Sequence, residues 1–310
     1  MQRVNICSVN ISEHIGTVKK PVSVIELLEQ GIRGDANSGP WNRQVSLLGM
    51  ESIRKFSAEA SRDFKPGEFA ENITTEGLTL WNLHPLDRLV CGEVELEITQ
   101  IGKECHGSGC SIFQEVGNCV MPKEGIFARV IRPGILKAGD WFDYQPKVFH
   151  VQVITLSDRA SFGVYEDKSG LRLQERIRDF FRQLEMSCTI HYSLIPDDRQ
   201  KLEEILIHAR KEAIDLIFTT GGTGISPKDI TPDVVKTILD KEIPGIMEMI
   251  RIKYGSEKPQ ALVSRSISGV MGTSLIFTLP GSVKAVNEYL DEIFRSLIHL
   301  IYMLHGLDSH

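Results

Sequence analysis

Four motifs rich in acidic, hydroxyl and glycine residues follow short apolar segments in the second half of this 310-residue chain. The segments span 148–156, 189–195, 215–220 and 274–279, and the motifs are Ser157-Asp158-Arg159, Pro196-Asp197-Asp198, Gly221-Gly222-Thr223-Gly224 and Pro280-Gly281-Ser282. Ligands of open parallel sheets bind beyond the carboxyl ends of the strands. We therefore expect the four motifs to meet at one sheet edge and form one site.

The glycine-rich motif at 221–224 is suited to binding an anion. Glycine permits positive φ and close backbone approach, and successive N–H groups can surround a phosphate. Thr223 could add a hydroxyl donor. The motif lacks the Gly-Lys-Ser/Thr ending of a P-loop and the spacing of a dinucleotide fingerprint. An ordinary strand-to-helix turn is the alternative interpretation.

Asp197 and Asp229 are the candidate catalytic and metal-binding carboxylates. Asp229 lies just past the glycine loop. If Thr231 is the N-cap of the following helix, that role accounts for Thr231, Pro232 and Asp233 but not for Asp229. Either Asp197 or Asp198 could cap a helix over 199–211, so Asp197 is open to both interpretations. Two carboxylates beside a phosphate loop make sense if Mg²⁺ lies between them and the phosphates. The pattern therefore predicts metal-assisted phosphoryl or nucleotidyl transfer.

The two halves of the chain have different patterns. From 147 to 310, strands alternate with helices predicted at 168–184, 199–211, 233–239, 245–254 and 286–304, which indicates a mostly parallel α/β sheet. From 1 to 146, short β-rich segments lie between turns, with one helix near 51–60, which indicates a β barrel or sandwich. Within it, residues 93–101 alternate between apolar residues on one face and Glu93, Glu95 and Glu97 on the other.

Composition limits the class of protein. Hydrophobic residues make up 42% and charged residues 25%, as in soluble globular proteins, and the length favours two domains. The net charge of -6 argues against binding nucleic acid. No apolar run is long enough to span a bilayer, and no signal peptide is visible, so we expect a cytoplasmic protein without membrane contact.

Residues 148–306 resemble molybdopterin adenylyltransferases of the MogA/MoaB type. The resemblance rests on six stretches in the family's order, at 156–168, 194–197, 219–224, 228–233, 261–265 and 279–282. It implies a three-layer α/β fold, a homotrimer, and Mg²⁺-dependent transfer of AMP from ATP to the terminal phosphate of molybdopterin, with release of pyrophosphate. A molybdenum-insertion protein or a molybdoenzyme is an implied partner.

The resemblance also implies roles for single residues. Asp197 and Asp229 match the family's two critical carboxylates. The glycine loop and Ser282 would hold phosphates, and Ser264 and Arg265 would help to bind the pterin. Further candidates for binding are Asp158, Pro280 and Gly281. The family's glycine loop is often followed by two basic residues, whereas this chain has only Lys228 there.

Residues 15–144 resemble a MOSC domain, a β-barrel module that is thought to bind the molybdenum cofactor or to carry sulfur on a cysteine. The resemblance rests on segments 31–35, 41–48, 69–73, 100–105, 125–130 and 139–140. Cys105 matches the family cysteine best by position, with Cys110 and Cys119 as alternatives. The candidate phosphate anchors are Arg33, Arg43 and Arg129, each of which could instead form a surface ion pair.

Two departures affect the predicted chemistry of the barrel. Asn37 and Asn42 stand where close relatives usually carry histidine, and asparagine cannot act as a base near neutral pH. Among the six cysteines, Cys105 and Cys110 form one pair with the C-x₂₋₄-C spacing of zinc sites, and no second such pair accompanies it.

The sequence leaves three hypotheses for function. The first is a fused enzyme, whose second domain adenylylates molybdopterin while the barrel binds the pterin or cofactor or delivers sulfur. The second is a carrier in which both domains bind the cofactor and neither turns over. The third is a redox or zinc protein that uses Cys105, Cys110 and Cys119.

Overall fold

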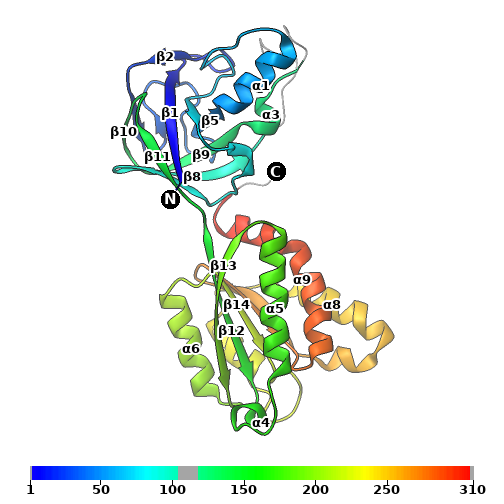
Figure 1. The fold of residues 1–310 in the computed structure, drawn as a ribbon. Coiled ribbons are helices and arrows are strands. Elements are labelled where there is room, and N and C mark those ends of the chain that lie inside the picture. The colour runs from blue at the N-terminus through cyan, green and yellow to red at the C-terminus, as the bar shows by residue number, and fades with distance from the viewer. Residues whose placement is uncertain (1, 104–117, 308–310) are drawn as a thin grey trace. The chain divides into compact units, whose positions relative to one another are not determined.

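The chain folds as two compact units. The computed structural model describes residues 2–103 and 118–307, so Cys105 and Cys110 lie outside the described residues. Residues 1–147 form the first unit and residues 148–310 the second. A mostly β barrel followed by an α/β domain was predicted, and both fold classes are confirmed (Figure 1). None of the described helices is long and apolar enough to cross a membrane.

The first unit is a closed barrel. Seven strands pair in the order β11 (Trp141–Gln145), β7 (Arg88–Cys91), β8 (Val94–Ile101), β9 (Ile126–Arg132), β5 (Val45–Gly49), β6 (Ile73–Glu76) and β1 (Gln2–Ile11). The barrel closes because β1 also pairs with β11, and β2 (Lys20–Val22) adds to β1. A small sheet contains β10 (Gly134–Leu136), β3 (Ile25–Leu28) and β4 (Gly31–Ile32).

Helices are few and short in this unit. They are α1 (Met50–Ala60), η1 (Leu80–Asn82) and α3 (Met121–Glu124) among the described residues. The barrel interior is filled by aliphatic residues, while α1 packs on a separate aromatic cluster of Phe56, Phe64 and Phe69.

The glutamates of β8 are not on an open face, although their alternation with apolar residues is typical of a strand with one face toward solvent. Glu95 and Glu97 are only 7% and 5% exposed. Arg88 and Arg132 pair with Glu95, and Arg88 and Arg129 pair with Glu97. Long arginine side chains from the neighbouring strands cover the carboxylates, because an arginine stem can shield a surface while its charged end pairs. Strand alternation alone could not reveal this cover.

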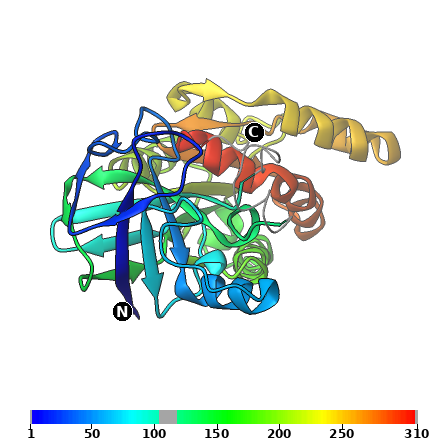
Figure 2. The same ribbon diagram turned by 90° about the horizontal axis from the view of Figure 1, so that it is seen from above.

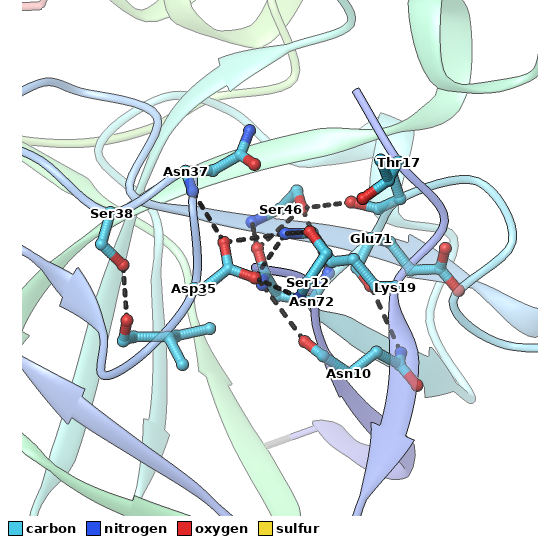
Figure 3. A network of polar contacts seen from close by, with 12 residues as sticks. Asn10, Ser12, Thr17, Lys19, Asp35, Asn37, Ser38, Ser46, Glu71 and Asn72 are labelled. Atoms are coloured by element: carbon cyan, nitrogen blue, oxygen red, sulfur yellow. Dashed lines mark hydrogen bonds and ion pairs between the residues drawn. The ribbon is translucent and has the colours of Figure 1, made fainter. Parts of the chain in front are cut away.

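A buried ion pair joins four segments of the barrel. Lys19 Nζ lies 2.7 Å from Asp35 Oδ1 and 2.5 Å from Oδ2, and both side chains are almost fully buried. Asn72 Nδ2 and the backbone N–H of Ser12 also donate to Asp35 Oδ2, as Figure 3 shows. Asp35 thereby fixes the loop after β4 to the end of β1 and the start of β6.

The second unit contains a mixed six-stranded sheet. Its order is β13 (Ser187–Ile195), β12 (Val148–Leu156), β14 (Leu216–Thr220), β17 (Ser274–Leu279), β16 (Ser268–Met271) and β15 (Lys241–Glu242). The first four strands are parallel and the last two antiparallel. In this register Leu156 pairs with Ile195, and Thr220 pairs with both Thr155 and Leu279. The carboxyl ends of the four parallel strands are therefore level with one another.

Helices cover both faces of this sheet, which gives the expected three layers. One face carries α5 (Lys168–Gln183) and α9 (Val283–Leu304), which lie side by side, with α8 (Pro244–Glu257) beside α9 (Figures 1 and 2). The other face packs α6 (Arg199–Lys211) and α7 (Thr231–Ile238) against Ile154, Ile217 and Ile276. The short elements α4 (Asp158–Ser161) and η3 (Pro259–Val263) follow β12 and α8.

Asp167 fixes the start of α5 at the carboxyl end of the sheet. Its carboxylate accepts hydrogen bonds from the Gly170 N–H at 2.9 Å and from the Tyr192 hydroxyl of β13 at 2.6 Å. Burial acts to raise the pKa of Asp167, but these hydrogen bonds outweigh burial and hold the pKa below its usual value. Burial and the bond to Asp167 raise the pKa of Tyr192 to about 12, so its hydroxyl remains a donor across the ordinary pH range.

We expect Lys19→Met to destabilise the barrel by about 3–5 kcal/mol, because it leaves the Asp35 carboxylate buried without its cation. The control is Lys20→Met. Lys20 is the exposed neighbour of Lys19, so its substitution should change the free energy of unfolding by about 0.5 kcal/mol or less. Denaturant unfolding followed by tryptophan fluorescence measures this unit alone, since all three tryptophans, Trp41, Trp81 and Trp141, lie in it. Equal effects of the two substitutions would contradict a stabilising role for the pair.

We expect Tyr192→Phe to cost about 1–2 kcal/mol of unfolding free energy at pH 7. Because the folded pKa of Asp167 is lowered, its contribution is complete above the unfolded value near 3.9 and is lost as pH falls through the folded pKa. The difference from wild type should therefore shrink below about pH 4. Tyr165→Phe, which removes a hydrogen bond to the neutral Ser157 hydroxyl, should show no such pH dependence. A pH-independent cost for Tyr192→Phe would argue against the charged partner.

Candidate functional site

A cavity of about 820 Å³ opens at the carboxyl ends of β12, β14 and β17. The segments that follow β12, β13, β14 and β17 all contribute to it, together with η3 and the starts of α5 and α9. The sequence-predicted residues that line it are Asp197, Gly221, Gly222, Thr223, Gly224, Asp229, Ser264, Pro280 and Gly281. The structure thus brings together motifs that are more than 100 residues apart in the chain.

The glycine loop is held by backbone contacts that leave no room for side chains. Gly221 and Gly222 have φ values of +101° and +62°, in the left-handed region that favours glycine. A Cβ on Gly221 would collide with the Leu156 carbonyl oxygen, and a Cβ on Gly281 would lie 3.3 Å from the Gly221 Cα. The loop therefore packs directly on the ends of β12 and β17.

Thr231 has a different role from the predicted helix N-cap. Ile230 occupies the cap position of α7, and Thr231 is the first residue of the helix. Its buried hydroxyl donates to the Gly221 carbonyl at 2.9 Å, and its N–H donates to the Gly222 carbonyl at 3.1 Å. The prediction was wrong because these are tertiary contacts, which local cap preferences do not describe. Thr231 attaches α7 to the glycine loop.

The structure separates the two adjacent aspartates after β13. Asp198 caps α6, since its Oδ1 accepts the Lys201 N–H at 3.0 Å. Asp197 does not cap that helix but exchanges hydrogen bonds with Asp158: each carboxylate accepts the other's backbone N–H, at 3.1 and 3.2 Å. Asp158 also pairs with Lys228 and is not among the residues that line the cavity.

Asp197 and Asp229 both line the cavity beside the glycine loop, Asp197 next to Gly222 and Asp229 next to Gly224. Asp229 Oδ2 accepts the Ser226 N–H at 2.8 Å, and a Cβ on Gly224 would lie 2.8 Å from that oxygen. A Cβ on Gly222 would lie 3.7 Å from Asp197 Oδ1. Burial, with repulsion from Asp158 and Asp229, raises the pKa of Asp197.

These two carboxylates suit a hard divalent cation that is shared with a substrate. Among the described residues, no group of three or more His, Cys, Asp or Glu is placed to hold a metal alone. Within the same residues, Oδ1 of Asp197 and Oδ1 of Asp229 accept no hydrogen bond, so both remain available as ligands. Mg²⁺ commonly takes one or two carboxylates and completes its shell with phosphate oxygens and water. The donor set fits that pattern.

Three other predicted residues support the cavity wall. Arg265 donates to the carbonyls of Gly224 and Asp229 and pairs with Asp233; it does not line the cavity. Ser282 caps α9 by accepting the Ala285 N–H and is likewise absent from the lining. Ser264 does line the cavity, and its hydroxyl accepts a hydrogen bond from Tyr289 at 2.9 Å.

Several cavity residues were not singled out from the sequence. Five carboxylates line the cavity, those of Glu166, Asp167, Asp197, Asp229 and Glu288, against a single lysine, Lys168. Tyr254 and Tyr289 add aromatic rings. For Asp167 and Lys168, their position at the start of a predicted helix was an available signal. Glu288 and Tyr289 lie on one face of a long amphipathic helix, where periodicity indicates only packing.

The barrel residues singled out from the sequence do not share one site. Arg33 pairs with Glu26 and Arg129 with Glu97, whereas Arg43 is exposed. Cys119 is 8% exposed and lines a separate cavity of about 190 Å³. Ser52, Lys55 and Lys123 also line that smaller cavity.

Comparison with known proteins assigns both units to families. Residues 152–299 match a probable molybdopterin binding domain, and residues 34–142 match the MOSC domain. The chain is 37% identical over 161 residues to a molybdopterin adenylyltransferase of Helicobacter pylori, covering 52% of this chain and 90% of that protein. It is 33% identical over 164 residues to molybdenum cofactor biosynthesis protein B of Bacillus cereus, covering 52% and 93%.

A solved structure gives a similar match. The molybdopterin biosynthesis enzyme MoaB of Thermus thermophilus is 34% identical, with a TM-score of 0.46, and the match covers 51% of this chain and 97% of that one. From the sequence matches, the chain belongs to the MogA/MoaB-type molybdopterin-binding family of molybdenum cofactor biosynthesis proteins, with a MOSC domain fused ahead of that domain.

Proposed function

We propose that the second unit transfers AMP from ATP to the terminal phosphate of molybdopterin, with Mg²⁺ bound by Asp197 and Asp229. The observation that carries this proposal is the placement of both carboxylates beside the glycine loop in one cavity. Relatives named molybdopterin adenylyltransferase support the same reaction. A phosphate oxygen of molybdopterin would attack the α-phosphorus of ATP, and pyrophosphate would leave.

The chain's own residues would act mainly by positioning. Backbone N–H groups of 222–224 would hold phosphate oxygens, since the Gly221 N–H is used by the Leu279 carbonyl, and Thr231 and Arg265 would keep that loop rigid. Bound Mg²⁺ would neutralise charge on the reacting phosphates. Phosphoryl-type transfer needs little covalent chemistry from a protein, so alignment and electrostatics account for most of the catalysis.

Lys168 would supply the cation that the sequence assigned to Lys228. Lys228 pairs with Asp158 and does not line the cavity. Lys168 lines it, is exposed, and makes no ion pair within the described residues. It is also the first residue of α5, where the helix dipole favours an anion. We assign it to the phosphates of ATP.

For the barrel we retain two roles, cofactor binding and sulfur transfer. The MOSC match supports both. Cys119 lines the small cavity, where Lys55 and Lys123 are accompanied by Glu59 and Glu124. A homotrimer formed through the second unit completes the proposal. Large apolar side chains that remain exposed on α8 and η3, namely Met249, Ile252, Leu262 and Val263, support such an assembly.

We expect Asp197→Asn and Asp229→Asn each to lower turnover about 100- to 1000-fold while molybdopterin still binds, because each removes charge at the metal and phosphates. The assay measures ATP consumption by the full chain with molybdopterin and Mg²⁺. Asp198→Asn is the matched control: asparagine caps a helix as well as aspartate, so its turnover should be unchanged. Full activity of the first two variants would contradict the roles assigned to Asp197 and Asp229, whereas a wild-type chain that consumes no ATP would leave the carrier hypothesis, in which both domains only bind the cofactor.

We expect Lys168→Met to raise the KM for ATP about 10-fold, because a charged hydrogen bond to phosphate is lost. Lys211→Met removes an exposed lysine at the other end of a helix and should leave this KM unchanged. An unchanged KM for ATP in Lys168→Met would refute its assignment to the phosphates.

A further inference from the structure

Part of the cavity lining differs in chemical character from the glycine loop. The residues that come from α9, α8 and η3 include Tyr254, Ala261, Val263 and Tyr289. These are aromatic and aliphatic side chains, unlike the glycine and carboxylate residues at the strand ends. Planar heterocycles bind against such surfaces, and a few polar groups then fix their orientation.

Glu288 is the carboxylate that these helical segments contribute to the lining. It lies six residues after Ser282 on α9, roughly 9 Å along the helix axis from the phosphate-side turn. Its side chain is 21% exposed. Its Oε1 lies 3.1 Å from Lys258 Nζ and 4.0 Å from Lys284 Nζ. Within the described residues, Oε2 accepts no hydrogen bond, so one carboxylate oxygen is available to a ligand.

Helix stability does not explain this arrangement. Lys284 is in the first turn of α9, where the helix dipole disfavours a cation, and Lys N-terminal to Glu is the weaker order for a pair four residues apart. The neighbouring ammonium of Lys258 also lowers the pKa of Lys284, so the two cations repel each other. Both cations lie against the same oxygen of Glu288 and thereby restrict the orientation of its carboxylate.

We propose that Glu288 is the specificity-determining residue for the pterin, whose ring N–H and adjacent amino group it accepts as a pair of hydrogen bonds. The inference rests on the proposed function and adds the group that recognises the acceptor substrate. A carboxylate offers two acceptors and no donor, which matches two parallel N–H groups. Adenine presents its amino group beside a ring acceptor, so it matches a carboxylate less well.

The first test compares the two substrates in the full chain. Glu288→Gln should raise the KM for molybdopterin about 10- to 100-fold, since two hydrogen bonds to a charged group are weakened, and should change the KM for ATP less than about twofold. Glu257→Gln, an exposed residue at the end of α8, should change neither. A rise confined to the KM for ATP would place adenine at Glu288 and overturn the proposal while leaving the adenylyl transfer intact.

The second test measures binding without turnover. Pterin (2-amino-4-oxopteridine) and lumazine, its 2,4-dioxo analogue, differ only at the group that Glu288 would read. Wild-type protein should bind pterin more tightly by fluorescence titration. Glu288→Gln should reverse the order, because an amide can donate to the 2-oxo group. An unchanged preference would overturn the proposal, whereas a wild-type chain that consumes no ATP with molybdopterin and Mg²⁺ would overturn the proposed function independently.

Discussion

Three strand ends approach one another at backbone distance around Gly221, and the rest of the cavity depends on that contact. The Gly221 N–H donates to the Leu279 carbonyl at 3.0 Å, while its Cα faces the Leu156 carbonyl on the other side. Any side chain at this position would push β14 away from β12 or β17. Because the strands are level, Asp197 and the glycine loop then leave the sheet at the same height, and Thr231 returns the chain to the loop.

Much of the fold could be predicted because it follows from hydrophobic periodicity. The helix expected at 199–211 has those bounds in the structure, and the strand expected at 148–156 likewise. A parallel sheet then places the strand ends together without further information. The sequence could not distinguish Asp197 from Asp198 as the helix cap, because the two are adjacent and equally suited. Only the hydrogen bonds with Asp158 distinguish them.

The features that sequence reasoning missed depend on contacts between distant segments. Thr231 has a good local cap sequence, yet its hydroxyl is used by Gly221 ten residues earlier. Arg265 lies in a stretch that resembles the family, but its guanidinium holds loop carbonyls. Glu95 and Glu97 follow strand alternation, yet arginines cover them. In each case the local pattern was insufficient, because the partner came from elsewhere in the fold.

The charge of the cavity constrains how anionic substrates can bind. Five carboxylates and one lysine line it, although ATP and molybdopterin both carry phosphates. A bare phosphate would be repelled, whereas a phosphate that brings Mg²⁺ would be attracted to Asp197 and Asp229. The carboxylate of Glu288 differs from that pair because Lys258 and Lys284 balance its charge, so it does not need the metal. The same acidic lining therefore divides into a part that needs a cation to accept phosphate and a part that can accept N–H donors directly.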